Sequence, residues 1–155
     1  MDVLRSLRRG PAPTTPAEIT PGHVLAPING NVVDETVVRL ACTLARRQQG
    51  KVTLLHIIEV PRSLPLDAEL NIEASRRILD TAAEVAEQMG VQAGTEIIQA
   101  RDAGATIVEE ARNMGAGLVL LGLPRLHRMG APSLGRTVPY VLLHAHCRVV
   151  VVRPA

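Results

Sequence analysis

The chain has 155 residues, which is enough for one domain with a sizeable hydrophobic core. Hydrophobic residues make up 46% of it, and this fraction excludes a chain that is disordered throughout. The formal net charge is only +2 and Tyr140 is the single aromatic residue. This composition excludes a dedicated nucleic-acid binder, which needs a basic surface and aromatic platforms for bases.

The first 21 residues are predicted to be a flexible, proline-rich extension outside the folded domain. Four prolines between residues 11 and 21 favour an extended linker. Val3, Leu4 and Leu7 share one helical face among arginines, so a short basic anchor for a partner or an anionic membrane is the alternative. We find no run long enough for a membrane span and no secretory signal. We expect a cytoplasmic protein whose domain covers residues 22–155.

After the extension, short apolar runs alternate with segments of helical period. The runs predict buried strands at residues 23–28, 52–58, 95–99, 118–121 and 147–152. The segments between them predict helices at about 33–47, 70–89, 107–114 and 136–145. In the second helix, the expected core-facing stripe is Leu70, Ala74, Ile78, Val85 and Met89. Such alternation is typical of an α/β protein with a parallel sheet and helices on both faces.

The C-terminal part of the chain carries the strongest functional signal. The run 118–121 ends at Gly122, a basic loop without acidic residues follows, and Gly135 precedes the last predicted helix. This arrangement can place a phosphate at a helix N-terminus beside the carboxyl end of a strand. Counted from Gly122, the spacing is two residues, Arg125, nine residues, Gly135 and Arg136.

That spacing resembles the nucleotide-binding signature of the universal stress protein family, G-x2-G-x9-G-[ST]. Two of its four positions differ, because Arg125 stands at the second glycine and Arg136 at the Ser or Thr. The downstream residues, LGRTVPYVLLHAHCRVVVVR, run in step with the family without a gap. The resemblance covers about residues 23–154. It implies an open five-stranded parallel sheet of order 3-2-1-4-5, a Rossmann-like fold of the adenine nucleotide alpha hydrolase type, and a role in stress response.

In such a sheet the ligand lies where the strand order reverses, at the ends of the first and fourth strands. The resemblance places ATP, ADP or AMP at the same point, with Asn29 where the family usually has Asp and Ile57 in the adenine pocket. Thr137 could contact a phosphate or cap the last helix. The candidate nucleotide-binding residues are Pro27, Ile28, Asn29, Ile57, Leu121, Gly122, Arg125, Gly135, Arg136 and Thr137.

Arg125 strongly affects the expected affinity. If its backbone adopts a positive φ, a residue other than glycine costs about 1–2 kcal/mol. A charge-assisted hydrogen bond from its guanidinium to a phosphate returns about 1.5–3 kcal/mol. These ranges overlap, so the sequence leaves open whether Arg125 assists or obstructs binding. We expect weak binding of an adenine nucleotide by a regulatory protein. The alternative is a dimeric interaction module that binds no nucleotide and acts through an unidentified protein partner.

Other kinds of site fit the sequence poorly. Residues 130–137 are one substitution from a P-loop, but a P-loop directly follows a strand, and here seven residues separate Gly122 from Gly130. His144, His146 and Cys147 match no familiar zinc spacing, so we expect no metal site. No nucleophile arrangement or carboxylate pair is visible. Slow ATP hydrolysis therefore lacks an evident base, and we do not expect an enzyme.

The last predicted strand carries four consecutive valines, Val149, Val150, Val151 and Val152. An unprotected apolar strand at a sheet edge invites aggregation. Pairing that edge with its copy about a twofold axis removes the hazard, and the family resemblance also implies dimerisation through this strand. We therefore expect a homodimer with antiparallel contact along these valines.

Overall fold

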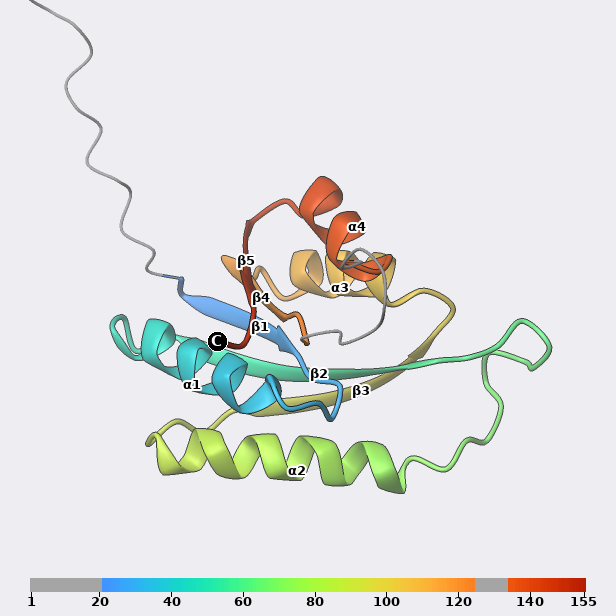
Figure 1. Cartoon of the computed structure of the whole chain (residues 1–155), viewed down its shortest axis with the longest axis horizontal. Coiled ribbons are helices and arrows are strands. Elements are labelled where there is room, and N and C mark those ends of the chain that lie inside the picture. Colours follow the sequence, from blue (N-terminus) through green and yellow to red (C-terminus); the bar gives the residue numbers. More distant parts are fainter. Residues whose placement is uncertain (1–20, 125–133) are drawn as a thin grey trace, which may run out of the picture.

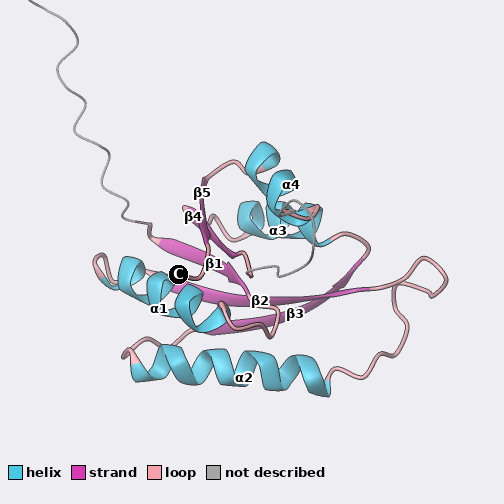
Figure 2. Cartoon of the chain, viewed as in Figure 1, coloured by secondary structure: helices cyan, strands magenta, loops and turns pink. Residues whose placement is uncertain are grey.

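The computed structural model describes residues 21–124 and 134–155. Arg125 and, except for Pro21, the predicted N-terminal extension lie outside the described residues. One sheet carries helices on both of its faces (Figures 1 and 2). The elements are β1 (His23–Pro27), α1 (Asp34–Arg46), β2 (Lys51–Glu59), α2 (Glu73–Gln88), β3 (Gly94–Ala100), α3 (Ala103–Asn113), β4 (Leu118–Gly122), α4 (Thr137–His144) and β5 (Arg148–Val152).

The sheet has the order β3-β2-β1-β4-β5, and neighbouring strands pair in parallel. Val24 of β1 pairs with Val52 of β2 on one side and with Leu118 of β4 on the other. The chain therefore builds outward from β1 to β3, then returns to the other side of β1 for β4. The predicted strand order and fold class are confirmed. The carboxyl ends of β1 and β4 flank the point where the order reverses.

The core has two layers, one on each face of the sheet. Val24 and Ala26 of β1 pack with α1 and α2, whereas Leu25 packs with α3 and α4. Alternate residues of β4 divide in the same way, because successive side chains of a strand point to opposite faces. Both faces are covered, which explains why β1 and β4 are continuous apolar runs rather than alternating ones.

The face that α2 buries differs from the predicted stripe. The helix begins at Glu73, so Leu70 lies in the preceding connection. Ala74 is exposed, and Ile78 is only half-buried. The residues that α2 buries are small apart from one leucine: Ser75, Leu79, Ala82 and Ala86. Small side chains let the helix approach the sheet closely, so the larger Ile78 flanks the contact instead of centring it.

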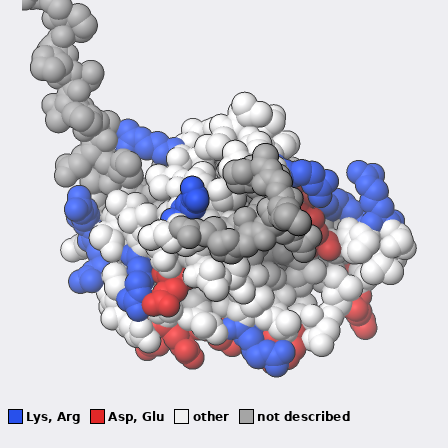
Figure 3. All heavy atoms as spheres, viewed as in Figure 1, with Lys and Arg blue, Asp and Glu red and all other residues white. Residues whose placement is uncertain are grey.

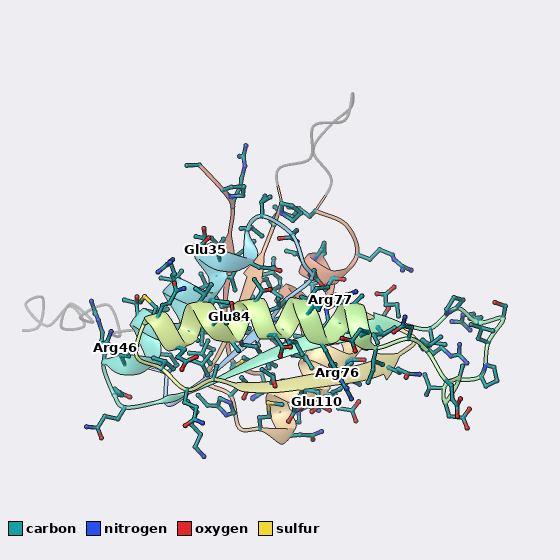
Figure 4. The ribbon with its side chains drawn as sticks, turned by 90° about the horizontal axis from the view of Figure 1, so that it is seen from below. Glu35, Arg46, Arg76, Arg77, Glu84 and Glu110 are labelled. Atoms are coloured by element: carbon teal, nitrogen blue, oxygen red, sulfur yellow. The ribbon has the colours of Figure 1, made fainter. Side chains whose placement is uncertain are left out.

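The outer face of α2 is charged. Arg76, Arg77 and Glu84 are exposed on it (Figure 4). At the far end of the helix, Arg46 of α1 donates to the carbonyl oxygen of Met89 over 2.9 Å. This bond joins the last turn of α1 to the C-terminus of α2, where carbonyl groups lack partners within the helix.

The connection after β2 is held by Arg101. Its guanidinium donates to the carbonyl oxygens of Val60, Pro61 and Leu64, at 3.1 Å for Val60 and 2.8 Å for Leu64. The N–H of Val60 also donates to the carbonyl oxygen of Ala100 over 2.8 Å. These bonds fix the end of β2, and with it the position of Glu59.

Candidate functional site

A pocket of about 390 Å³ opens where the strand order reverses. We call it the switch-point pocket. Its walls come from the carboxyl ends of three strands, the start of α3, and both described ends of the β4–α4 connection. The lining residues are Pro27, Asn29, Leu55, Ile57, Glu59, Ala103, Ile107, Leu121, Gly122, Leu123, Pro124, Leu134, Gly135, Thr137 and Val138.

Seven of the ten candidate residues line this pocket. They are Pro27, Asn29, Ile57, Leu121, Gly122, Gly135 and Thr137. Arg125 lies outside the described residues. Ile28 and Arg136 do not line it, for different reasons.

Ile28 is buried in the core on the α1 side of the sheet. Its N–H donates to the carbonyl oxygen of Leu55 over 2.8 Å, and its own carbonyl oxygen lies 2.7 Å from Nδ1 of His56. Side-chain alternation explains why Ile28 does not line the pocket, since it must face away from its neighbours Pro27 and Asn29. Its role is to fix the end of β1.

Arg136 lies outside the pocket with its side chain 86% exposed. Its Nη2 is 3.9 Å from Oε2 of Glu59, a residue that does line the pocket. The contact of Arg136 with a phosphate stays a prediction; in the structure its guanidinium lies near the carboxylate of Glu59.

Gly122 and Gly135 are required for different reasons. A Cβ on Gly122 would lie 2.5 Å from Cγ1 of Val33 and 3.0 Å from Cγ2 of Val37. Close packing of β4 against the start of α1 therefore demands glycine there, independently of any ligand. Gly135 has open space around it but a φ of +68°, which L side chains rarely adopt. Its backbone turns the chain into α4.

Asp34 fixes the loop that follows β1. Its carboxylate accepts hydrogen bonds from the N–H groups of Gly30 at 2.6 Å, Asn31 at 3.1 Å and Asn29 at 3.4 Å. Burial raises the pKa of this carboxyl, and these backbone donors offset part of the rise. The loop thereby holds Asn29 at the edge of the pocket, where its side-chain amide can both donate and accept.

Two helix N-termini border the pocket, and they differ in how they are capped. At α3, Asp102 accepts from the N–H of Ala105 over 2.8 Å, and Glu59 accepts from the N–H of Ala103 over 3.2 Å. At α4, the N-cap residue is Arg136, and its side chain makes no cap hydrogen bond. Thr137 is the first residue of α4 and therefore does not cap it, while its contact with a phosphate stays a prediction. Of the two termini, α4 is the better place for an anion, because none of the hydrogen bonds of residues 21–124 and 134–155 joins a carboxylate to its first turn, whereas two carboxylates accept from α3.

Sequence reasoning missed the walls that β2 and the helices contribute. Leu55, Ile57 and Glu59 are two residues apart on one strand, so they face the same side of the sheet. Because Ile57 was already expected in the pocket, the two-residue period of a strand could also have predicted Leu55 and Glu59. Ile107 and Val138 approach from helices through tertiary packing, for which the sequence offers no local signal.

A second depression of about 510 Å³ lies between the β1–α1 loop and α2. We call it the α1–α2 groove; Val32, Asp34, Glu35, Ala74 and Ile78 are among its lining residues. Although larger, it is the poorer anion site, because two carboxylates, those of Asp34 and Glu35, line it at the start of α1.

The remaining side chains offer no metal site within residues 21–124 and 134–155, where no group of three or more His, Cys, Asp and Glu could hold an ion. His144 instead stacks on the Tyr140 ring at 4.1 Å, one helical turn earlier. In the same two ranges, no helix is long and apolar enough to cross a membrane.

Comparison with protein families settles the relationship. The model of the universal stress protein family matches residues 21–153. The chain belongs to the universal stress protein family. A universal stress protein of Methanocaldococcus jannaschii is 26% identical over 138 residues, which cover 84% of this chain and 81% of that relative.

Solved structures of this family share the fold. A universal stress protein in complex with cAMP superposes with a TM-score of 0.66 at 18% identity, covering 84% of this chain and 94% of that one. A universal stress protein from Archaeoglobus fulgidus in complex with dAMP gives a TM-score of 0.65 at 18% identity, covering 83% and 94%. Identity this low relates the folds, and the ligands named belong to those proteins.

Proposed function

We propose that this universal stress protein is a cytoplasmic regulatory protein that binds an adenine nucleotide weakly in the switch-point pocket. The observation that carries the proposal is the start of α4, where the N-cap residue Arg136 makes no side-chain cap hydrogen bond and Thr137 lines a pocket with an apolar wall. A helix N-terminus favours phosphate because its first N–H groups lack partners within the helix and because the helix dipole is positive there.

The remaining lining suits the other parts of a nucleotide. Leu55, Ile57 and Ile107 form an apolar wall that can take a purine ring. Asn29 supplies a donor and an acceptor at its edge, and Gly135 and Thr137 lead into the phosphate end. The cAMP and dAMP complexes of relatives support an adenine nucleotide as the ligand class.

Weak affinity is the expectation because the pocket also contains an acid. Glu59 lines it, and its carboxylate opposes any phosphate nearby. Among the described residues on the face shown in Figure 3, Lys and Arg side chains are interspersed with Asp and Glu.

A second function, a dimeric interaction module, is favoured by the surface of the last two elements. All four valines of β5 are only half-buried, and Leu143 of the adjacent α4 is 80% exposed. An apolar edge of this kind fits a second copy of the chain, and a protein partner would then bind the dimer. The two functions are compatible, since the pocket and this edge lie on different strands.

Titration calorimetry with AMP, cAMP and ATP tests the nucleotide proposal. We expect dissociation constants in the high-micromolar to millimolar range for the wild-type protein. Ala103→Leu adds bulk at the pocket wall and is expected to weaken AMP binding about tenfold or more. Ala74→Leu adds the same bulk to the α1–α2 groove and serves as the matched control. Equal loss of binding in both variants, or no heat at millimolar ligand, would contradict the proposal.

A further inference from the structure

Glu59 and Arg136 lie near each other at the rim of the switch-point pocket, where Glu59 lines the pocket and Arg136 lies just outside it. Glu59 ends β2, and Arg136 directly precedes α4, whose first residue Thr137 also lines the pocket. The distance from Oε2 of Glu59 to Nη2 of Arg136 is 3.9 Å, and the side chains are 46% and 86% exposed. At this exposure the pair contributes little to stability. The pair nevertheless lies at the expected phosphate end of the pocket, where its charges would act on a bound phosphate.

The two oxygens of Glu59 have separate partners. Oε1 accepts from the N–H of Ala103 and so caps α3, while Oε2 is the atom that faces Arg136. A phosphate entering beside Thr137 would compete with Oε2 for the guanidinium. It would also meet the negative charge of the carboxylate, and this repulsion grows with each phosphate added to the ligand.

We propose that Glu59 makes the pocket select against phosphate charge, so that it favours adenosine and monophosphates over ATP. The inference rests on the proposed nucleotide function and refines it. Glu59 occupies Arg136 and presents its own charge to the phosphate site. Glu59→Gln removes the charge but keeps an oxygen that can accept from Ala103, so the cap on α3 is retained.

The test compares three ligands that differ only in phosphate number. Adenosine, AMP and ATP are titrated without divalent ions, at low and at high salt, into the wild type, Glu59→Gln and Glu109→Gln. Glu109 is an exposed carboxylate on α3 that does not line the pocket. For Glu59→Gln we expect unchanged adenosine affinity, an AMP affinity raised about threefold and an ATP affinity raised about tenfold. These gains should shrink at high salt, and Glu109→Gln should show none.

The variant Arg136→Gln provides an independent test, because this side chain is largely exposed and its replacement should leave the fold intact. Without its partner, Glu59 should repel ATP more strongly, so ATP affinity is expected to fall severalfold while adenosine affinity is unchanged. If AMP binds but the AMP-to-ATP preference is the same in the wild type, Glu59→Gln and Arg136→Gln, the inference is overturned while the proposed function stands. If none of the three ligands binds any of these proteins, both are overturned.

Discussion

Gly122→Ala is expected to lower the free energy of unfolding by about 1–3 kcal/mol. The added Cβ would lie 2.5 Å from Cγ1 of Val33 and 3.0 Å from Cγ2 of Val37, and both valines are fully buried or nearly so. A core packed to this density can relieve the overlap only by moving β4 away from α1. Urea denaturation of the wild type and Gly122→Ala measures the difference in free energy of unfolding, if both curves are fitted with the same dependence of that free energy on urea concentration.

Two further variants separate packing from backbone conformation. Gly135→Ala is expected to cost about 1–2 kcal/mol through its positive φ, although nothing lies within 4 Å of the added carbon. Val33→Ala makes room beside Gly122 and none at Gly135. In the Val33→Ala background the cost of Gly122→Ala should therefore fall, while that of Gly135→Ala should not. An undiminished cost of Gly122→Ala would show that the contact with Val33 is not its cause.

Val151→Pro is expected to convert a dimer into a monomer. The carbonyl oxygen of Val152 accepts from the N–H of Leu123, so the backbone of Val152 faces β4. Backbone groups of successive strand residues point to alternate sides, which turns the N–H of Val151 toward the open edge. Proline there removes a donor needed for pairing with a second copy and leaves the β4 ladder intact.

Light scattering measures the result, with Val151→Thr as a control that keeps the N–H. The wild type and Val151→Thr should have about twice the 16.6 kDa mass of the chain, and Val151→Pro should have the mass of one chain. A wild-type protein that is monomeric at micromolar concentration would refute dimerisation. If Val151→Pro remains dimeric, the dimer interface must lie somewhere other than this edge.

The sheet was predictable because strand positions followed from apolar runs alone. β1 and β4 are buried on both faces, so they appear in the sequence as unbroken apolar segments. The strand order needed the family resemblance, since alternation of strands and helices is compatible with several orders. The buried face of α2 was predicted only in part: Ile78, Val85 and Met89 pack against the core half-buried, but the smaller Ala82 and Ala86 lie at its centre. Size suggests burial, but close helix packing favours small residues.

The pocket was predictable where the backbone makes it and less so where side chains do. The switch-point rule located Pro27, Asn29 and Gly122 correctly beside the pocket. The same reasoning could not orient Arg136, because a long side chain at a helix start can reach several neighbours. Its approach to Glu59 depends on the crossing of β2 and α4 in space.

Amide chemical-shift mapping with AMP tests the central claim most directly, because it reports where a weak ligand binds. Titration of isotope-labelled protein should shift the amides of Asn29, Ile57, Gly122, Gly135 and Thr137, which line the switch-point pocket. Amides of the α1–α2 groove, such as Val32 and Thr81, should stay in place. Shifts confined to that groove, or none at millimolar AMP, would contradict the assignment of the switch-point pocket as a nucleotide site.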